Sequence, residues 1–212
     1  IMLPFIIGGA VLLGALALFS GNGKKIAIAG GRGNGKTTLF DYLSNQSVSG
    51  QRTPTQSKNQ VAQKTIKIND VSVDLSRCYD VGGSEASYQQ WVEEIKKADF
   101  LFYLFNIKKI IDVDFDYQNQ MRKELSYISK VVRDKKAENQ EFKIILVGTH
   151  ADKVSLSRND FHAFEKMVWA KPILKEAVIA LGGKGQCQIV LGSLASNNSA
   201  KMLVDSIFKS MK

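Results

Sequence analysis

The sequence Gly30-Gly31-Arg32-Gly33-Asn34-Gly35-Lys36-Thr37 constrains the fold of this chain more than any other feature. It follows the short apolar segment Lys25-Ile26-Ala27-Ile28-Ala29 and precedes a stretch, residues 37–43, that has the character of a helix. A glycine-rich turn between a strand and a helix lets several backbone N–H groups converge on a phosphate chain. Because all eight residues and the strand–loop–helix setting are present, we predict a nucleotide site rather than a glycine-rich turn without a ligand.

Each residue type in this loop has a chemical task. Glycine lets the main chain wrap closely around the phosphates, because it has no side chain to hold the backbone away. Lys36 is expected to reach the β- and γ-phosphates, and the Thr37 hydroxyl is expected to bind Mg²⁺. The other residues predicted to contact the phosphates are Gly30, Arg32, Gly33, Asn34, Gly35 and Thr38.

The remainder of the chain alternates apolar strands with helices. This order predicts an α/β fold, a three-layer P-loop domain over residues 24–212 with a mostly parallel six-stranded sheet. Two of the strands, 61–68 and 71–81, are expected to form a hairpin through Asn69-Asp70. The later strands are expected at 100–105, 142–147 and 188–191, and helices near 88–95, 121–136, 159–181 and 200–211.

Two further segments are predicted to sense the terminal phosphate. Asp80-Val81-Gly82-Gly83 ends a predicted strand, so that Asp80 can hold Mg²⁺ through water while the Gly83 N–H contacts a γ-phosphate. The polar stretch 44–60 has almost no apolar residues and is expected to form a long functional loop. Within it, Thr55 is expected to close on Mg²⁺ and the γ-phosphate, as in loops that γ-phosphate orders and hydrolysis releases.

Residues 1–19 contain no charged side chain and are rich in Ile, Leu, Val, Ala and Gly. At about 1.5 Å per residue such a helix just crosses a hydrocarbon core of about 30 Å, so we expect a single transmembrane anchor over residues 1–20. A cleaved signal peptide is the alternative, because Ala15-Leu16-Ala17 resembles a small-residue cleavage site. Lys24 and Lys25 follow the apolar run and, by the positive-inside rule, place the domain on the cytosolic side of the membrane.

The net charge of +9 favours a partner of opposite charge, either nucleic acid or an anionic membrane surface. One predicted helix has a basic face but no aromatic or glycine-rich recognition module beside it, so we expect no nucleic acid partner. The linker Ser20-Gly21-Asn22-Gly23 is short enough to hold the domain against anionic lipid headgroups. The basic face is made of Arg122, Lys123, Lys130, Arg133, Lys135 and Lys136.

Together these motifs resemble the Ras superfamily of small GTPases, specifically the Arf branch and its membrane-anchored relative, the signal-recognition-particle receptor beta subunit. The Pro54-Thr55 pair, the hairpin between the two phosphate-sensing segments and Asp80-Val81-Gly82-Gly83 are Arf-like, and the apolar run before the domain is beta-subunit-like. The resemblance implies GTP or GDP with Mg²⁺ as ligands. It also implies a nucleotide-dependent switch that recruits or regulates a protein effector or complex partner.

In that family an Asn-Lys-x-Asp motif after the fifth strand recognises guanine, and here Thr149-His150-Ala151-Asp152 stands in its place. Asp152 is retained, and its carboxylate can accept both guanine N–H donors, which adenine does not offer. Thr149 replaces the asparagine and His150 the lysine, and the His150 ring can stack on the base. Ser193-Leu194 loosely matches the last base-contacting loop of the family.

A second departure concerns hydrolysis. The family glutamine that orients the attacking water corresponds here to Ser84, which is too short to hold water in line with the γ-phosphate. The resemblance therefore implies slow intrinsic hydrolysis around Lys36, Thr55, Gly83 and Ser84, unless Glu85 or a residue of the long loop substitutes. A degenerate GTP-binding scaffold subunit that does not cycle is the alternative function. An ATP-dependent enzyme is disfavoured by Asp152.

Overall fold

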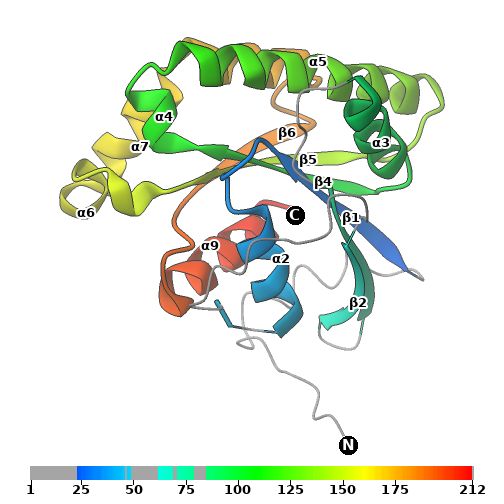
Figure 1. Cartoon of the computed structure of the whole chain (residues 1–212), viewed down its shortest axis with the longest axis horizontal. Helices are drawn as coiled ribbons and strands as arrows, with labels where there is room; N and C mark the ends of the chain where they lie inside the picture. Colours follow the sequence, from blue (N-terminus) through cyan, green and yellow to red (C-terminus); the bar gives the residue numbers. More distant parts are fainter. Residues whose placement is uncertain (1–22, 46, 49–61, 69–70, 79–84, 212) are drawn as a thin grey trace, which may run out of the picture.

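The computed structural model describes residues 23–45, 47–48, 62–68, 71–78 and 85–211 (Figure 1). The anchor predicted at residues 1–20 therefore lies outside the described residues, as do four predicted site residues, Thr55, Asp80, Gly83 and Ser84. Within the described part of the chain, no helix combines the length and apolar character that a membrane span requires.

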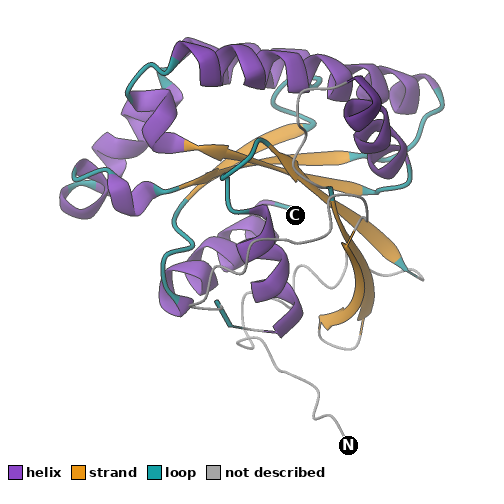
Figure 2. Ribbon diagram, in the orientation of Figure 1, coloured by secondary structure: helices purple, strands orange, loops and turns teal. Residues whose placement is uncertain are grey.

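Six strands form one sheet in the order β2-β3-β1-β4-β5-β6 (Figures 1 and 2). Only the β2–β3 pair is antiparallel, so the prediction of a mostly parallel six-stranded sheet is confirmed. The predicted hairpin partners are paired as expected, with Ile66 opposite Val73. The strands are β1 (Lys24–Gly30), β2 (Ala62–Ile68), β3 (Val71–Arg77), β4 (Phe100–Asn106), β5 (Lys143–Thr149) and β6 (Cys187–Leu191).

Helices follow most of the strands, as the alternating pattern predicts. The stretch predicted as mostly helical from 159 to 181 is interrupted twice, because the Asp160 side chain caps one helix and Pro172 begins another. The helices are α2 (Lys36–Asn45), α3 (Glu85–Lys96), α4 (Ile107–Ile111), α5 (Phe115–Ala137), α6 (Leu156–Asn159), α7 (Phe161–Trp169), α8 (Pro172–Ala180) and α9 (Asn197–Ser210), with the 3-10 helix η2 (Ala151–Lys153).

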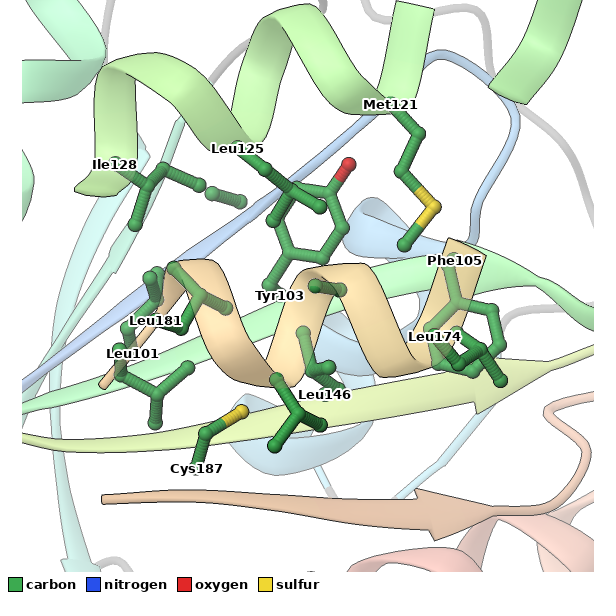
Figure 3. Packing of buried hydrophobic residues seen from close by; sticks show 14 of the residues in the cluster. Leu101, Tyr103, Phe105, Met121, Leu125, Ile128, Leu146, Leu174, Leu181 and Cys187 are labelled. Carbon is green, nitrogen blue, oxygen red and sulfur yellow. The ribbon is translucent and has the colours of Figure 1, made fainter. Parts of the chain in front are cut away.

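The helices cover the sheet on both faces. Figure 1 shows α3 and α5 on one face and α2 and α9 on the other, which gives the predicted three layers. Alternate residues of the central strands point to opposite faces, so Tyr103 packs towards α5 while Phe102 packs towards Phe208 of α9. Figure 3 shows Met121, Leu125 and Ile128 of α5 packed with Leu101, Tyr103, Phe105 and Leu146 of the sheet and with Leu174 and Leu181.

One residue assigned to the basic face of the long helix lies elsewhere. Lys135 of α5 is buried, and its ammonium lies 5.0 Å from the centroid of the Phe142 ring. Its Nζ donates a hydrogen bond to Gln140 Oε1 at 3.2 Å, and burial lowers the pKa of Lys135. The prediction for Lys135 was wrong because its ammonium turns back to the Phe142 ring and to Gln140, contacts that the helical spacing alone does not reveal.

Candidate functional site

The phosphate-binding sequence forms the connection between β1 and α2, as predicted. Gly30, Gly33 and Gly35 all have positive φ, at 136°, 77° and 88°, a region that other residues rarely adopt. A Cβ on Gly30 would lie 2.2 Å from Leu104 O, whereas a Cβ on Gly33 would meet no heavy atom within 4 Å among the described residues. The loop is therefore pressed against β4 at Gly30 and open at Gly33 within the described residues.

Lys36 begins α2 and is 4% exposed. Its Nζ donates hydrogen bonds to Gly30 O at 2.7 Å and Gly31 O at 3.0 Å. An ammonium has three donors and no acceptor, so these contacts fold the lysine back over its own loop. The structure thus keeps a positive charge against the part of the chain where the sequence predicts the β- and γ-phosphates.

Asn34 anchors the loop through its side chain. It is 1% exposed, its Nδ2 donates to Leu104 O at 2.8 Å, and its Oδ1 accepts from Tyr117 Oη at 3.2 Å. Tyr117 Oη in turn accepts from Asn106 N at 2.7 Å, and burial raises the pKa of this phenol far above its ordinary value. The Asn34 side chain therefore ties the loop to β4 and α5. Tyr117 is a residue of the site that the sequence reading missed.

A buried carboxylate lies beside the loop. Glu124 of α5 is 1% exposed and accepts a hydrogen bond from Tyr103 Oη at 2.7 Å. A Cβ on Gly31 would lie 3.4 Å from Glu124 Oε1, so the loop passes close to the carboxylate. Gln120 donates to the same oxygen at 3.1 Å and also to Tyr88 Oη of α3. The loop is thus linked through α5 to α3, the helix that follows the predicted phosphate-sensing segment Asp80-Val81-Gly82-Gly83.

The base end of the site begins where β5 ends. Thr149 is 1% exposed, and its Oγ1 lies 3.1 Å from both Asn34 O and Phe105 O. His150 follows with a left-handed φ of 64°, and its Nδ1 lies 2.8 Å from Thr149 Oγ1. Thr149, which stands in the place of the family asparagine, therefore joins the base end directly to the phosphate-binding loop.

Asp152 and Ser193 meet at this end although they are far apart in sequence. Ser193 Oγ donates to Asp152 Oδ1 at 2.6 Å and accepts from Ala195 N at 3.1 Å. Burial acts to raise the pKa of Asp152, but the Ser193 hydroxyl and the Lys153 ammonium outweigh it and hold the pKa below its usual value. The carboxylate that the sequence assigns to guanine is accordingly kept ionised.

Leu194 completes the connection between the two ends. A Cβ on Gly35 would lie 2.9 Å from Leu194 Cδ1, so the leucine packs directly on the phosphate-binding loop. The segment that carries it is held by backbone hydrogen bonds from Ala151 N to Gly192 O at 3.0 Å and from Gly192 N to Gly148 O at 2.9 Å. The structure therefore brings Ser193 to Asp152 and Leu194 to the glycine loop.

The remaining predicted residues differ in their surroundings. Arg32 is exposed, Thr38 is half-buried, and the Thr37 hydroxyl accepts a hydrogen bond from Arg77 Nη1. Arg77 and Glu124 were missed by the sequence reading. The sequence pattern could have identified Arg77. Val73, Leu75 and Arg77 occupy alternate positions of β3 and so face the same side of the sheet, and Arg77 is the charged one among them.

The residues in place fit a nucleotide and Mg²⁺. Three glycines of positive φ shape an open loop, Lys36 supplies a buried cation, and Thr37 supplies a hydroxyl oxygen of the kind that Mg²⁺ takes. In comparisons with known proteins, the model of the Arf family, described as the ADP-ribosylation factor family, matches residues 14–159. No curated protein matches the chain.

Proposed function

Because the chain belongs to the Arf family of small GTPases, which are nucleotide-dependent switches, we propose that it is a membrane-anchored switch that acts on a protein partner at the cytosolic membrane face. The observation that supports nucleotide binding by this switch is the junction of the two ends of the site. The glycine loop, Thr149 and Leu194 are in direct contact, so one ligand can touch the phosphate end and Asp152 together.

Arf GTPases bind GTP and GDP with Mg²⁺. In this chain the backbone N–H groups of the glycine loop and the Lys36 ammonium hold the phosphates, and Thr37 is the described residue that offers an oxygen to the metal. When bound, Mg²⁺ neutralises the charge of the β- and γ-phosphates. Thr55, Asp80 and Gly83 lie outside the described residues. From the sequence, we assign to them further contacts with the metal and the γ-phosphate.

Guanine recognition is assigned to Asp152. Its ionised carboxylate accepts the two adjacent N–H donors of guanine, and the Ser193 hydroxyl holds one of its oxygens in place. Thr149 positions the base end by its contact with Asn34 O, and the His150 ring is assigned to the face of the base.

Slow hydrolysis follows in this proposal from Ser84, which occupies the place of the water-orienting glutamine. In small GTPases even the intact glutamine depends on an arginine for fast turnover. We therefore propose that a partner accelerates the reaction. The apolar run at residues 1–20, with Lys24 and Lys25 behind it, supports a single-pass anchor like that of the signal-recognition-particle receptor beta subunit.

A second candidate function is a scaffold subunit that holds GTP and does not cycle. The differences from the family motif at the base end favour this scaffold function. His150 Nδ1 lies 2.8 Å from Thr149 Oγ1, and these two residues stand where the family has two residues that bind the base. The two candidates differ in whether nucleotide state changes the protein.

Turnover and proteolysis separate the two candidates. The full chain, purified in detergent, is loaded with GTP, and phosphate release is followed for wild type and Ser84→Gln. The switch predicts slow release by wild type, faster release by Ser84→Gln, and different protease patterns around Thr55 in the GTP and GDP states. No release by either protein, with identical patterns in both states, would contradict the switch and favour the scaffold.

Membrane attachment is tested separately. The full chain is expected to resist alkaline extraction from membranes, and a chain that starts at Lys24 is expected to be extracted. Extraction of both would contradict the anchor.

A further inference from the structure

Arg77 is a charged side chain at the edge of an apolar core. It is the last residue of β3, and it lies two and four residues after Leu75 and Val73, which pack in the core shared with α2 and α9. Because side chains alternate along a strand, Arg77 points to the same face as these two residues. Its guanidinium carbon lies 5.8 Å from the centroid of the Phe40 ring of α2.

At this place Arg77 holds the side chain expected to bind the metal. Its Nη1 donates a hydrogen bond to Thr37 Oγ1, in the first turn of α2. The strand end is fixed there because Arg77 is in register with Ile28 of β1, and Cys78 N donates to Ile28 O at 2.9 Å. The contact therefore arises from the sheet pairing rather than from a loop.

The Arg77 guanidinium and a metal ion bound at the Thr37 hydroxyl would repel each other. Arginine is positively charged at every physiological pH. A metal about 2 Å from Thr37 Oγ1 would lie within about 5 Å of a guanidinium that kept its own bond of about 3 Å to the same oxygen. Repulsion between positive charges is strong at that separation in a partly buried site. The two cations therefore disfavour each other at the Thr37 hydroxyl.

Asp41 offers the guanidinium another partner on the same helix. It lies one helical turn after Thr37, on the same side of α2. Burial raises the pKa of Asp41, while the charges of Arg77 and Lys64 act in the opposite direction, so Arg77 already influences this carboxyl group. In its present position, Arg77 Nε is buried and has no hydrogen-bond partner within the ranges that the structure describes.

We propose that Arg77 competes with Mg²⁺ for the Thr37 hydroxyl and thereby sets the Mg²⁺ concentration at which the chain retains its nucleotide. At low Mg²⁺ the guanidinium holds Thr37 and places a positive charge at the phosphate end. At higher Mg²⁺ it leaves Thr37 and turns towards Asp41. Arg77 is a positioning residue, because it acts through Thr37, and the inference rests on the proposed nucleotide binding.

The test measures nucleotide release at controlled free Mg²⁺. The full chain in detergent is loaded with fluorescently labelled GDP, and the release rate is followed as free Mg²⁺ is varied with EDTA. Arg77→Met removes the charge and keeps an unbranched stem over Phe40. It should lower the Mg²⁺ concentration for half-maximal slowing of release by about tenfold, the effect of one charge-assisted hydrogen bond. Lys201→Gln, an exposed lysine of α9, removes the same charge and should leave this concentration unchanged.

If Arg77→Met needs the same Mg²⁺ concentration as wild type for half-maximal slowing of GDP release, or a higher one, the proposal is overturned. Nucleotide binding itself would still stand. Failure of wild type to bind labelled GDP would overturn the proposed function together with it. A second measurement is made on the wild-type protein, and a variant serves only to identify the signal. The Nε–H signal of Arg77, identified by its loss in Arg77→Lys, should shift when Mg²⁺ is added to the GDP-loaded protein. An unchanged signal would also overturn the proposal.

Discussion

The two ends of the proposed nucleotide site match the family pattern to different degrees. At the phosphate end every position of the glycine loop is retained, Gly30 has no room for a side chain beside the Leu104 backbone, and Gly35 has a left-handed φ of 88°. At the base end Thr149 and His150 replace two motif residues, yet Thr149 still contacts the loop and Asp152 still meets Ser193. Backbone shape therefore restricts the residues at the phosphate end, whereas at the base end Thr149 and Asp152 keep their contacts although two motif residues differ.

The largest expected effect is at the phosphate end. Lys36→Ala removes the buried ammonium that lies on Gly30 O and Gly31 O, and we expect nucleotide affinity to fall below detection in a labelled-GDP binding assay. Lys97→Ala, a half-exposed lysine paired with Glu94, serves as the control and should bind normally. Retained binding by Lys36→Ala would mean that the loop assignment is wrong.

Asp152→Asn should have the next largest effect. The amide loses the negative charge that accepts the guanine N–H donors, so GDP affinity should fall about 10- to 100-fold, as for loss of one charge-assisted hydrogen bond. ADP affinity should not change, because adenine offers no such donors. Competition binding with both nucleotides measures this, with Asp134→Asn of α5 as the matched control. Equal losses for GDP and ADP would show that Asp152 supports the fold and does not recognise the base.

Thr149→Val tests the link between the two ends. The substitution keeps the shape of the side chain but removes the hydroxyl near Asn34 O and Phe105 O, and it should destabilise the fold by about 1–2 kcal/mol. The melting temperature should fall by roughly 2–8 °C. Thr65→Val removes an exposed hydrogen bond to Asp74 and should have little effect. Equal melting temperatures for all three proteins would argue against the link.

The smallest expected effect is the pH dependence of Asp152. Its pKa is lower in the folded state than in the unfolded chain, so its contribution to stability is fully present above the unfolded value of about 3.9. That contribution is lost as pH falls through the folded pKa. The difference in unfolding free energy between wild type and Asp152→Asn should therefore be constant from pH 7 to 5 and shrink below about pH 4. A difference that changes between pH 7 and 5 would contradict this assignment.

Much of the fold followed from local sequence patterns. Continuous apolar runs marked β4 and β5, and the glycine loop fixed the order of strand, loop and helix. The contacts of Asn34, Arg77 and Glu124 did not follow, because they depend on strand register and on which helix covers which face. The family resemblance assigned Asp152 and Ser193 to the base end, but the hydrogen bond between them did not follow from it or from any spacing in the sequence.

The central claim is that one site binds a guanine nucleotide. It is tested most directly by equilibrium binding of GDP and ADP to the purified full chain in the presence of Mg²⁺. We expect GDP to bind at least about 100-fold more tightly than ADP, because a site that accepts hydrogen bonds from buried donors rejects a base that lacks those donors. Equal affinity for the two nucleotides, or tighter binding of ADP, would contradict it.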